Sequence, residues 1–339
     1  MPSPLISIII PLFNREDLVR DTLDSLLVQT SSEWEAIVVD DGSTDKSREK
    51  VLEYIAHNPQ IKLFCRPDNR RKGPSACRNF GFEHAAGEIV FYLDSDDLLE
   101  PHFCENAVRQ FRNGPSLDFI GVQCVTFPGK VDAIPQKLVP PLPHSNEIRD
   151  HFLKKSLQIQ TETFCWRKSF LDRYPRHWPE DQRVGEDRVC YYRMITAPCR
   201  GAWEEGQIQV FHRTGSASHG RYDQLTPRIN RDPVLAAERV LTAERITEAF
   251  RRNGNLNPES VDLLLKNGLS CLRGVLSYNH RQAAQRIFQM TTALAEEFGR
   301  KEILRRARFY MLLRNVFRFH RIPAVEKTYA FFRRILMEK

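Results

Sequence analysis

The 339-residue sequence lacks several patterns that identify common classes of protein. Its eight cysteines include no CxxC pair, so neither a zinc framework nor a disulfide scaffold is indicated. It contains no GxGxxG and no P-loop, the two commonest phosphate-cradling sequences. The longest apolar run near the start, Leu5 to Phe13, includes Pro11 and is too short to span a bilayer, and no basic residue precedes it as in a signal peptide. We therefore expect reduced thiols and a cytoplasmic location.

Positive charge is concentrated at the end of the sequence. The formal net charge is +7, yet residues 300–339 alone contain twelve Lys and Arg against three Glu. The rest of the chain is close to neutral, which argues against a general nucleic-acid binder. Aromatic residues are interleaved with the basic ones, a pattern that suits peripheral contact with an anionic membrane. A solvated basic face on a packed helix is the alternative.

Short apolar strands alternate with helical patterns in the first part of the sequence. Candidate strands begin near residues 5, 36, 61 and 89, and the helix before the last of them is expected to end at Gly87. This alternation predicts βαβ units and a mostly parallel sheet, hence an α/β fold. From Gln224 onward the pattern is helical. We therefore expect an α/β domain at residues 1–225 and an all-helical region at 226–339.

The second half gives weaker local predictions. Leu117 to Thr126 is predicted to be one further strand, and the proline-rich segment 128–143 to be irregular. Asn257 followed by proline is a typical helix start. The apolar positions between Ala283 and Phe298 recur at helical spacing, which predicts a buried helix face that ends at the next glycine.

Carboxylates gather directly after the predicted strand Ile89 to Leu93. The sequence there is Asp94-Ser95-Asp96-Asp97, at the strand edge where open α/β sheets bind ligands. In extended chain Asp94 and Asp96 project to the same side, so a divalent cation between them would relieve their repulsion. Mg²⁺ and Mn²⁺ take oxygen ligands and often carry a diphosphate. An acidic turn that caps the following helix is the alternative.

Two other strand ends carry polar residues. Asn14 follows the first strand and is expected to cap the next helix. Asp40 and Asp41 follow the second strand. A carboxylate in that position can accept a hydrogen bond from a pyrimidine ring or from ribose hydroxyls, or it can cap the helix after it. The residues alone leave these roles open.

Four motifs in order resemble a known family: SIIIPLFNRED, VVDDGSTD, KGPSACRNFG and FYLDSDD. They are similar to the nucleotide-sugar-binding half of the family 2 inverting glycosyltransferases, which have the GT-A fold. The match is close over about residues 5–112 and looser to about residue 220. The resemblance implies transfer of a sugar from a UDP- or TDP-sugar donor, with Mn²⁺ or Mg²⁺, to a glycan or lipid-linked acceptor of a bacterial-type surface polysaccharide.

The resemblance also assigns roles to individual residues. The nucleotide-sugar site would be formed by Pro11, Phe13, Asn14, Glu16, Asp40, Asp41, Lys72, Gly73, Arg78, Asp94 and Ser95. Asp41 would contact the base, and Asp96 would bind the metal. Lys72, Gly73 and Arg78 would lie in a loop that approaches the nucleotide and the sugar. His212 or Arg213 would approach the diphosphate, and His212 would be a second metal ligand; a structural role at the strand end is the alternative for both residues. Asp97 is expected to cap the following helix.

The catalytic base is expected in Gly185-Glu186-Asp187. An inverting transfer needs one carboxylate to take the acceptor's proton while the nucleoside diphosphate leaves from the opposite face. The resemblance implies that the Glu-Asp pair supplies it; we expect Asp187 to act, with Glu186 as the alternative. Acidic residues in a first helical turn also complement the helix dipole, so a structural role is the competing interpretation.

Three other functions are alternatives for a sequence of this kind. A nucleotidyltransferase also places aspartates on an α/β sheet, but it would carry a glycine-rich, lysine-containing loop after the first strand. A dinucleotide-binding oxidoreductase is disfavoured because the GxGxxG is missing. A non-catalytic carbohydrate-binding or scaffold protein on the same fold is disfavoured by the intact acidic residues.

Overall fold

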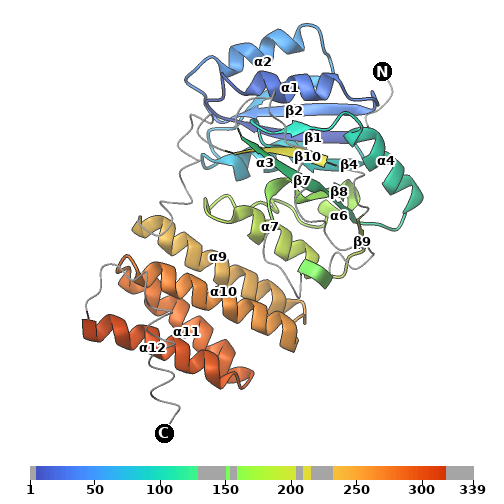
Figure 1. The fold of residues 1–339 in the computed structure, drawn as a ribbon. Helices are drawn as coiled ribbons and strands as arrows, with labels where there is room; N and C mark the ends of the chain where they lie inside the picture. Colours follow the sequence, from blue (N-terminus) through green and yellow to red (C-terminus); the bar gives the residue numbers. More distant parts are fainter. Residues whose placement is uncertain (1–4, 129–149, 153–158, 204–208, 215–231, 318–339) are drawn as a thin grey trace. The chain divides into compact units, whose positions relative to one another are not determined.

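The computed structural model describes residues 5–128, 150–152, 159–203, 209–214 and 232–317. They form two compact units, which are considered separately (Figure 1). The α/β unit holds every described strand and the helices from α1 to α7. The helical unit holds α9 to α12 together with the short segment Arg183–Gly185. Nearly all of the proline-rich segment 128–143, and the tail from residue 318, lie outside the described residues.

The α/β unit is built on a seven-stranded sheet of order β3-β2-β1-β4-β8-β6-β9. The first four strands pair in parallel, β8 pairs antiparallel with β4 and β6, and β9 pairs in parallel with β6. The strands are β1 (Ile6–Leu12), β2 (Trp34–Asp40), β3 (Ile61–Cys65), β4 (Ile89–Tyr92), β6 (Phe119–Gly121), β8 (Phe164–Arg167) and β9 (Gly201–Ala202). The predicted mostly parallel sheet is confirmed.

A second, three-stranded sheet consists of β5 (Leu98–Leu99), β10 (Gln209–Thr214) and β7 (Gln123–Pro128). The prediction of one strand from Leu117 to Thr126 was wrong, because β6 and β7 belong to different sheets. Val122 separates them, and its N–H donates to the carbonyl of Thr163 at 2.9 Å. The chain therefore changes sheets at this residue.

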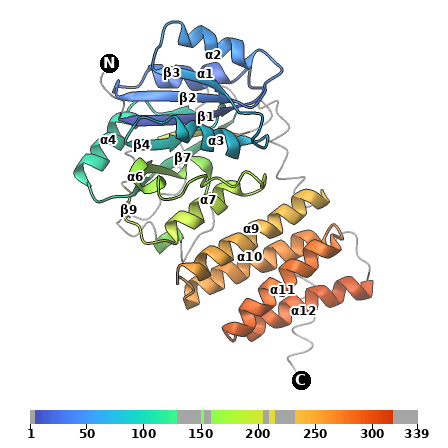
Figure 2. The same cartoon turned by 180° about the vertical axis from the view of Figure 1, so that it is seen from behind.

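Helices cover both faces of the main sheet (Figures 1 and 2). They are α1 (Val19–Leu27), α2 (Ser47–Ile55), α3 (Pro74–Glu83), α4 (Phe103–Asn113), α6 (Lys168–Leu171) and α7 (Glu186–Ile195), with a 3₁₀ turn η2 (Thr161–Thr163). Alternate residues of β1 face opposite sides. Ile8 packs with α1 and α4, whereas Ile9 faces α3, where a Cβ on Gly81 would lie 2.5 Å from its side chain. Glycine thus lets α3 approach the sheet closely.

Three local predictions were wrong. Asn14 does not cap α1, which begins only at Val19; the residue instead adopts a left-handed φ of 50°. Gly87 does not end α3, and a Cβ there would lie 2.7 Å from the Ser7 nitrogen, so the glycine permits contact with β1. Asp97 does not cap α4, because its carboxylate binds residues of β10.

The helical unit packs four described helices around one core: α9 (Pro233–Arg252), α10 (Pro258–Leu276), α11 (Arg281–Glu297) and α12 (Lys301–Phe317). The predicted helical C-terminal region is confirmed. Asn257 caps α10 by accepting from the Ser260 N–H at 2.9 Å. Within α12, Ala307 and Tyr310 are buried in this core. The beginning of the basic tail is therefore part of the packed structure.

The state of the cysteines and the hydropathy of the helices can be read from the described residues. All eight cysteines lie in the described residues, none forms a disulfide, and only Cys65 is exposed. Among the helices described, none is both long enough and apolar enough to cross a membrane.

Candidate functional site

The loops after β1 and β4 meet at the carboxyl edge of the parallel strands. The chain runs outward from β1 through β2 to β3 and then returns to the other side of β1 to form β4. The crevice at such a reversal is where open α/β sheets bind ligands. Strand β10 adjoins the same loop: the Arg213 N–H donates to Asp97 Oδ1 at 2.8 Å, and its Nε donates to the Asp96 carbonyl at 2.9 Å.

Each aspartate in the loop after β4 has its own basic partner. The pairs and their distances are Asp94–Arg78 at 2.7 Å, Asp96–Arg15 at 3.3 Å and Asp97–His212 at 2.9 Å. The three partners come from different parts of the chain: α3, the loop after β1, and β10. The acidic loop is therefore held by charge pairs on three sides.

Arg78 is almost completely buried, with a side chain 3 % exposed. The resemblance placed it in a loop; it lies instead inside α3. Its guanidinium stacks on the Trp178 ring at 4.4 Å and donates to Thr161 Oγ1 at 3.2 Å. Its Nη1 lies 3.8 Å from Glu186 Oε1. One buried cation thus connects Asp94 with the acidic start of α7.

The two carboxylates predicted to include the catalytic base, Glu186 and Asp187, lie at the start of a helix, as expected. Helix α7 starts at Glu186, directly after Gly185, whose φ is 66°. Burial, and then the charge of Asp187, raise the pKa of Glu186 above its usual range, although Arg78 opposes the shift. Burial also raises the pKa of Asp187, whose Oδ1 accepts from the Arg188 N–H at 2.7 Å. Carboxylates with raised proton affinity suit a general base near neutral pH.

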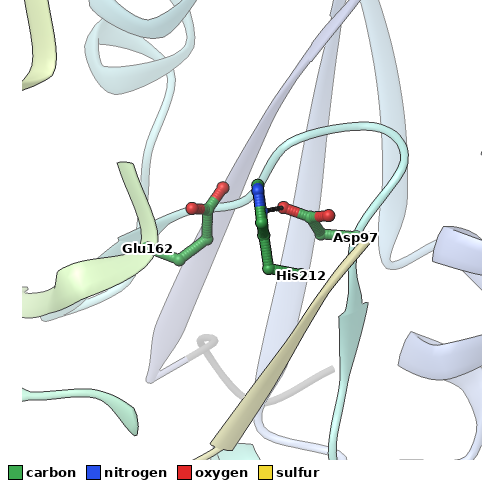
Figure 3. Close-up of side chains that lie close together, drawn as sticks. All are labelled: Asp97, Glu162 and His212. Atoms are coloured by element: carbon green, nitrogen blue, oxygen red, sulfur yellow. Dashed lines mark hydrogen bonds and ion pairs between the residues drawn. The ribbon is translucent and has the colours of Figure 1, made fainter. Parts of the chain in front are cut away.

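Asp97, Glu162 and His212 form a cluster in which one ligand atom from each lies within 4.8 Å of the others (Figure 3). His212 lies between the two carboxylates, and its Nδ1 is bound to Asp97. The pKa of His212 rises to about 10, because the hydrogen bond and charge of Asp97 outweigh burial. Burial and the charges of Asp94 and Asp97 raise the pKa of Glu162 well above its usual range.

This donor set fits a divalent cation. Carboxylate oxygens and the nitrogen of a neutral imidazole are ligands that Mn²⁺ accepts, so an ion bound at His212 would displace the proton that the raised pKa retains there. A histidine ligand commonly has its other ring nitrogen held by a carboxylate, which is the relationship between His212 and Asp97. A buried carboxylate such as Glu162, 1 % exposed, gains from a nearby positive charge. The predicted ligand His212 belongs to this cluster. The other predicted ligand, Asp96, does not: it directly precedes Asp97 in the sequence and pairs with Arg15.

A second group of predicted residues surrounds the end of β2. Asp41 is buried and pairs with Arg66. Burial raises the pKa of Asp41, while Arg66 and Lys72 act in the opposite direction. The Lys72 ammonium lies 3.9 Å from the centre of the Phe13 ring. Lys72 therefore links the predicted base-contacting aspartate with the aromatic ring after β1.

Asn14 and Glu16 connect the loop after β1 to the loop after β2. Asn14 Oδ1 accepts from the Thr44 N–H at 2.8 Å, and Glu16 Oε2 accepts from the Lys46 N–H at 3.0 Å. Their described contacts are thus made with the neighbouring loop. The two loops are clamped together beside the site.

The remaining predicted residues occupy fixed places along the backbone. Pro11 lies within β1, and Gly73 immediately precedes α3 with a φ of 146°. Asp40 ends β2, and its Oδ1 accepts from the Ser43 N–H at 3.1 Å. Ser95 is buried in the loop after β4.

Sequence reasoning missed four residues of the site: Arg15, Arg66, Glu162 and Trp178. Arg66 directly follows β3, so the strand-end rule that selected Asp41 would also have selected it. Arg15 lies within the quoted PLFNRED motif but was assigned no role. Glu162 and Trp178 belong to segments without a motif, and nothing in the sequence marks them.

These features define the class of the α/β unit: a mostly parallel sheet with a group of acidic side chains at the switch point, where the strand order reverses. Residues 7–174 match the family model described as "Glycosyl transferase family 2". A Haemophilus influenzae protein named "Uncharacterized glycosyltransferase" is 44% identical over 99 residues, which are 29% of this chain and 39% of that protein. The chain therefore carries a family 2 glycosyltransferase domain.

Two further similarities bear on fold and relatives. The Escherichia coli protein named "UDP-Glc:alpha-D-GlcNAc-diphosphoundecaprenol beta-1,3-glucosyltransferase WfgD" is 39% identical over 98 residues, covering 29% of this chain and 37% of that protein. Residues 1–349 of S. aureus TarS, solved in complex with UDP, superpose with a TM-score of 0.55 at 18% identity and cover 91% of both chains. The fold is thus GT-A. This chain spans about two fifths to about half of the first curated relatives it matches.

Proposed function

We propose that the protein is an inverting, metal-dependent glycosyltransferase that uses a UDP- or TDP-sugar as donor. One observation carries this proposal: the buried Arg78 guanidinium contacts Asp94 at 2.7 Å and lies 3.8 Å from Glu186. These contacts support the proposal that Asp94, at the carboxyl edge of the sheet, and the Glu-Asp pair at α7 belong to one site. A transferase needs this arrangement, because the donor and the base must meet at the same sugar carbon.

The nucleotide would lie over the ends of β1 and β2. Asp41, buried next to Arg66, would accept a hydrogen bond from the base, and Phe13 and Lys72 would flank it. Support for a uridine nucleotide comes from the GT-A neighbour TarS, which was solved with UDP. The sugar would then point toward Asp94 and Arg78.

The transfer would proceed as a single displacement. Asp187 takes the proton of the acceptor hydroxyl, and the oxygen of that hydroxyl forms the new bond to the anomeric carbon. The bond from this carbon to the diphosphate oxygen breaks, and the nucleoside diphosphate leaves from the opposite face, so the configuration is inverted. Glu186 is the alternative base. Its contact with Arg78 suits it better to holding the site together.

A divalent ion, Mn²⁺ or Mg²⁺, would be held by Asp96 and His212, with Glu162 as a neighbouring carboxylate. When bound, the ion supplies positive charge to the leaving diphosphate. His212 is already oriented by Asp97, and β10 runs along the loop that carries Asp96, because Arg213 binds the Asp96 carbonyl. The protein therefore positions these donors through pairings of its own side chains.

The acceptor would be a glycan or a lipid-linked sugar of a surface polysaccharide. The name of the E. coli relative specifies such an acceptor, a sugar on diphosphoundecaprenol. The basic residues of α12 and the tail after it would bring the enzyme to an anionic membrane surface, where this class of acceptor lies. The enzyme would act as a cytoplasmic, peripheral membrane protein.

A thermal-shift panel tests the donor assignment. The full chain is melted with UDP, TDP, GDP, ADP and CMP, each with Mn²⁺ and with EDTA. A ligand that binds only the folded state raises the midpoint as its concentration exceeds Kd. We expect UDP or TDP with Mn²⁺ to give the largest shift. The proposal fails if no nucleotide shifts the midpoint, or if the shift is the same in EDTA.

A further inference from the structure

Arg15 is anchored through its backbone at the entrance of α1. Its N–H donates to Ser47 Oγ at 2.6 Å, and its carbonyl accepts from the N–H groups of Leu18 and Val19 at 3.0 and 2.9 Å. The Cα of Arg15 is therefore fixed by two neighbouring segments. Any movement of this residue has to be a movement of its side chain.

The side chain of Arg15 reaches across the switch point to the loop after β4. Its Nε lies 3.3 Å from Asp96 Oδ2, and the two side chains are only 10 % and 15 % exposed. Limited solvent exposure makes such a pair stronger than an ion pair on the surface. A positive charge thus already lies beside the carboxylate that was assigned to the metal.

A metal ion and a guanidinium cannot both lie against one carboxylate without repelling each other. Like charges at this separation repel strongly where solvent is partly excluded, and a divalent ion repels the guanidinium more than a monovalent ion would. Arg15 therefore opposes the binding of a divalent ion to Asp96. The opposition disappears if Arg15 finds another anion, and a diphosphate bound by the metal would be next to it.

We propose that Arg15 exchanges one ion-pair partner for another. Its side chain pairs with Asp96 until metal and nucleotide bind together, and it then moves to form an ion pair with the nucleotide's diphosphate. The inference rests on the proposed function. The planar guanidinium matches two phosphate oxygens at once, so Arg15 gains as much in the new pairing as it gives up. The exchange makes the metal bind weakly alone and tightly with the nucleotide.

The test measures binding rather than activity. Mn²⁺ is titrated into the full chain and followed by the electron paramagnetic resonance of free Mn²⁺, first alone and then with saturating UDP; UDP affinity is measured by calorimetry in Mn²⁺. Arg15→Gln removes the charge, and Arg15→Lys keeps it. Arg20→Gln is the matched control, because Arg20 is an exposed residue of α1 whose partner is Glu53.

Arg15→Gln should act in opposite directions on the two ligands. We expect Mn²⁺ alone to bind about tenfold more tightly than to wild type, and UDP in Mn²⁺ to bind at least about tenfold more weakly, tenfold being 1.4 kcal/mol. Arg15→Lys should stay close to wild type for Mn²⁺ alone, and Arg20→Gln should match wild type for both ligands. General damage to the loop would weaken both ligands together.

Two failures can be told apart. If wild type binds UDP with Mn²⁺ but Arg15→Gln binds Mn²⁺ alone no more tightly than wild type, the exchange is overturned and the proposed function stands. If neither protein binds Mn²⁺ or UDP in any combination, the proposed function falls and the exchange falls with it.

Discussion

The Arg78 guanidinium lies between the Asp94 carboxylate, 2.7 Å away, and the Trp178 ring, 4.4 Å from its centre. Its side chain is 3 % exposed, and the Nε and Nη1 atoms donate to no acceptor within the described residues. Removing such a buried cation is strongly destabilising, because the carboxylate it pairs with would remain buried without a compensating charge. Arg78 therefore contributes to both the stability and the geometry of the site.

Arg78→Gln should destabilise the fold and weaken donor binding. Loss of charged hydrogen bonds to Asp94 and Thr161 should lower the free energy of unfolding by about 1.5–3 kcal/mol, measured by urea denaturation. Arg78→Lys keeps the positive charge but lacks the planar guanidinium that donates to two acceptors and stacks on Trp178. We therefore expect its free energy of unfolding to lie between those of wild type and Arg78→Gln. Arg112→Gln is the control, because Arg112 is 66% exposed and should change little. An Arg78→Gln variant as stable as this control would contradict the assignment.

Asp187→Asn should separate catalysis from binding. The amide keeps the shape of the helix start but cannot accept a proton, so transfer should fall by roughly 10² to 10⁴-fold while UDP affinity and Tm stay close to wild type. Glu186→Gln, the matched variant, should instead disturb the contact with Arg78. If Asp187→Asn transfers sugar normally and Glu186→Gln does not, Glu186 is the base. If both remain active, the pair only begins α7.

The rate of transfer should depend on pH through the same pair. The base must be deprotonated to act, and the pKa values of Glu186 and Asp187 are both raised, mainly by burial. We therefore expect kcat/KM to rise with pH, with an apparent pKa above that of a solvent-exposed carboxylate. A profile that is flat down to pH 4.5, recorded with wild type and buffers of constant ionic strength, would exclude this.

Glu35 provides a test of stability away from the site. It is buried on β2 and accepts from Ser7 Oγ at 2.6 Å, from Lys62 Nζ at 2.6 Å and from the Ala86 N–H at 2.7 Å. Burial alone would raise the pKa of Glu35, but the three bonds together lower it below its ordinary value of 4.5. The ionised form is thus favoured in the folded protein.

Glu35→Gln should cost about 1–3 kcal/mol of unfolding free energy at pH 7. A lowered pKa stabilises the fold above the unfolded value, and that contribution is lost as pH falls through the folded value. The difference between wild type and variant should therefore shrink below about pH 4.5, in urea titrations at pH 7, 5 and 3.5. An unchanged difference across this series would mean that the charge of Glu35 is not what stabilises the fold.

The basic tail should be truncated after residue 317, not at 300. Ala307 and Tyr310 are part of the helical core, so an earlier cut would expose apolar surface. We expect removal of 318–339 to reduce sedimentation with anionic liposomes at low salt, while UDP binding and Tm stay unchanged. An intact chain that ignores such liposomes would show that the tail does not contact membranes.

The sequence was sufficient for the parallel strands and for the acidic residues at their ends. Apolar runs separated by helical patterns marked β1 to β4, and strand ends in a parallel sheet share one edge. Periodicity was less reliable beyond the strand. Asp94 and Asp96 were expected on one side of an extended chain, but β4 ends at Tyr92 and the aspartates lie in a turn. They consequently pair with different cations.

Partners distant in sequence could not be predicted. Asp97 and His212 are 115 residues apart, and no local pattern in the sequence indicates that their side chains will pair. Asp97 was interpreted as a helix cap because local rules see only the following residues. Glu162 was missed for the same reason: its role arises from the three-dimensional position of η2 beside β10, not from its neighbours in the sequence.

The late position of β10 in the chain has a consequence during synthesis. The parallel strands and Asp97 leave the ribosome first, while His212 is added 115 residues afterwards. At about 5–20 residues per second, the interval is roughly 6–23 seconds. During that interval the Asp97 carboxylate, which is buried in the folded protein, has no His212 to pair with. Strand β5 likewise lacks β10, the strand with which it pairs. A nascent chain stalled before residue 209 should therefore be sensitive to protease around residues 94–99 and become resistant once β10 has emerged.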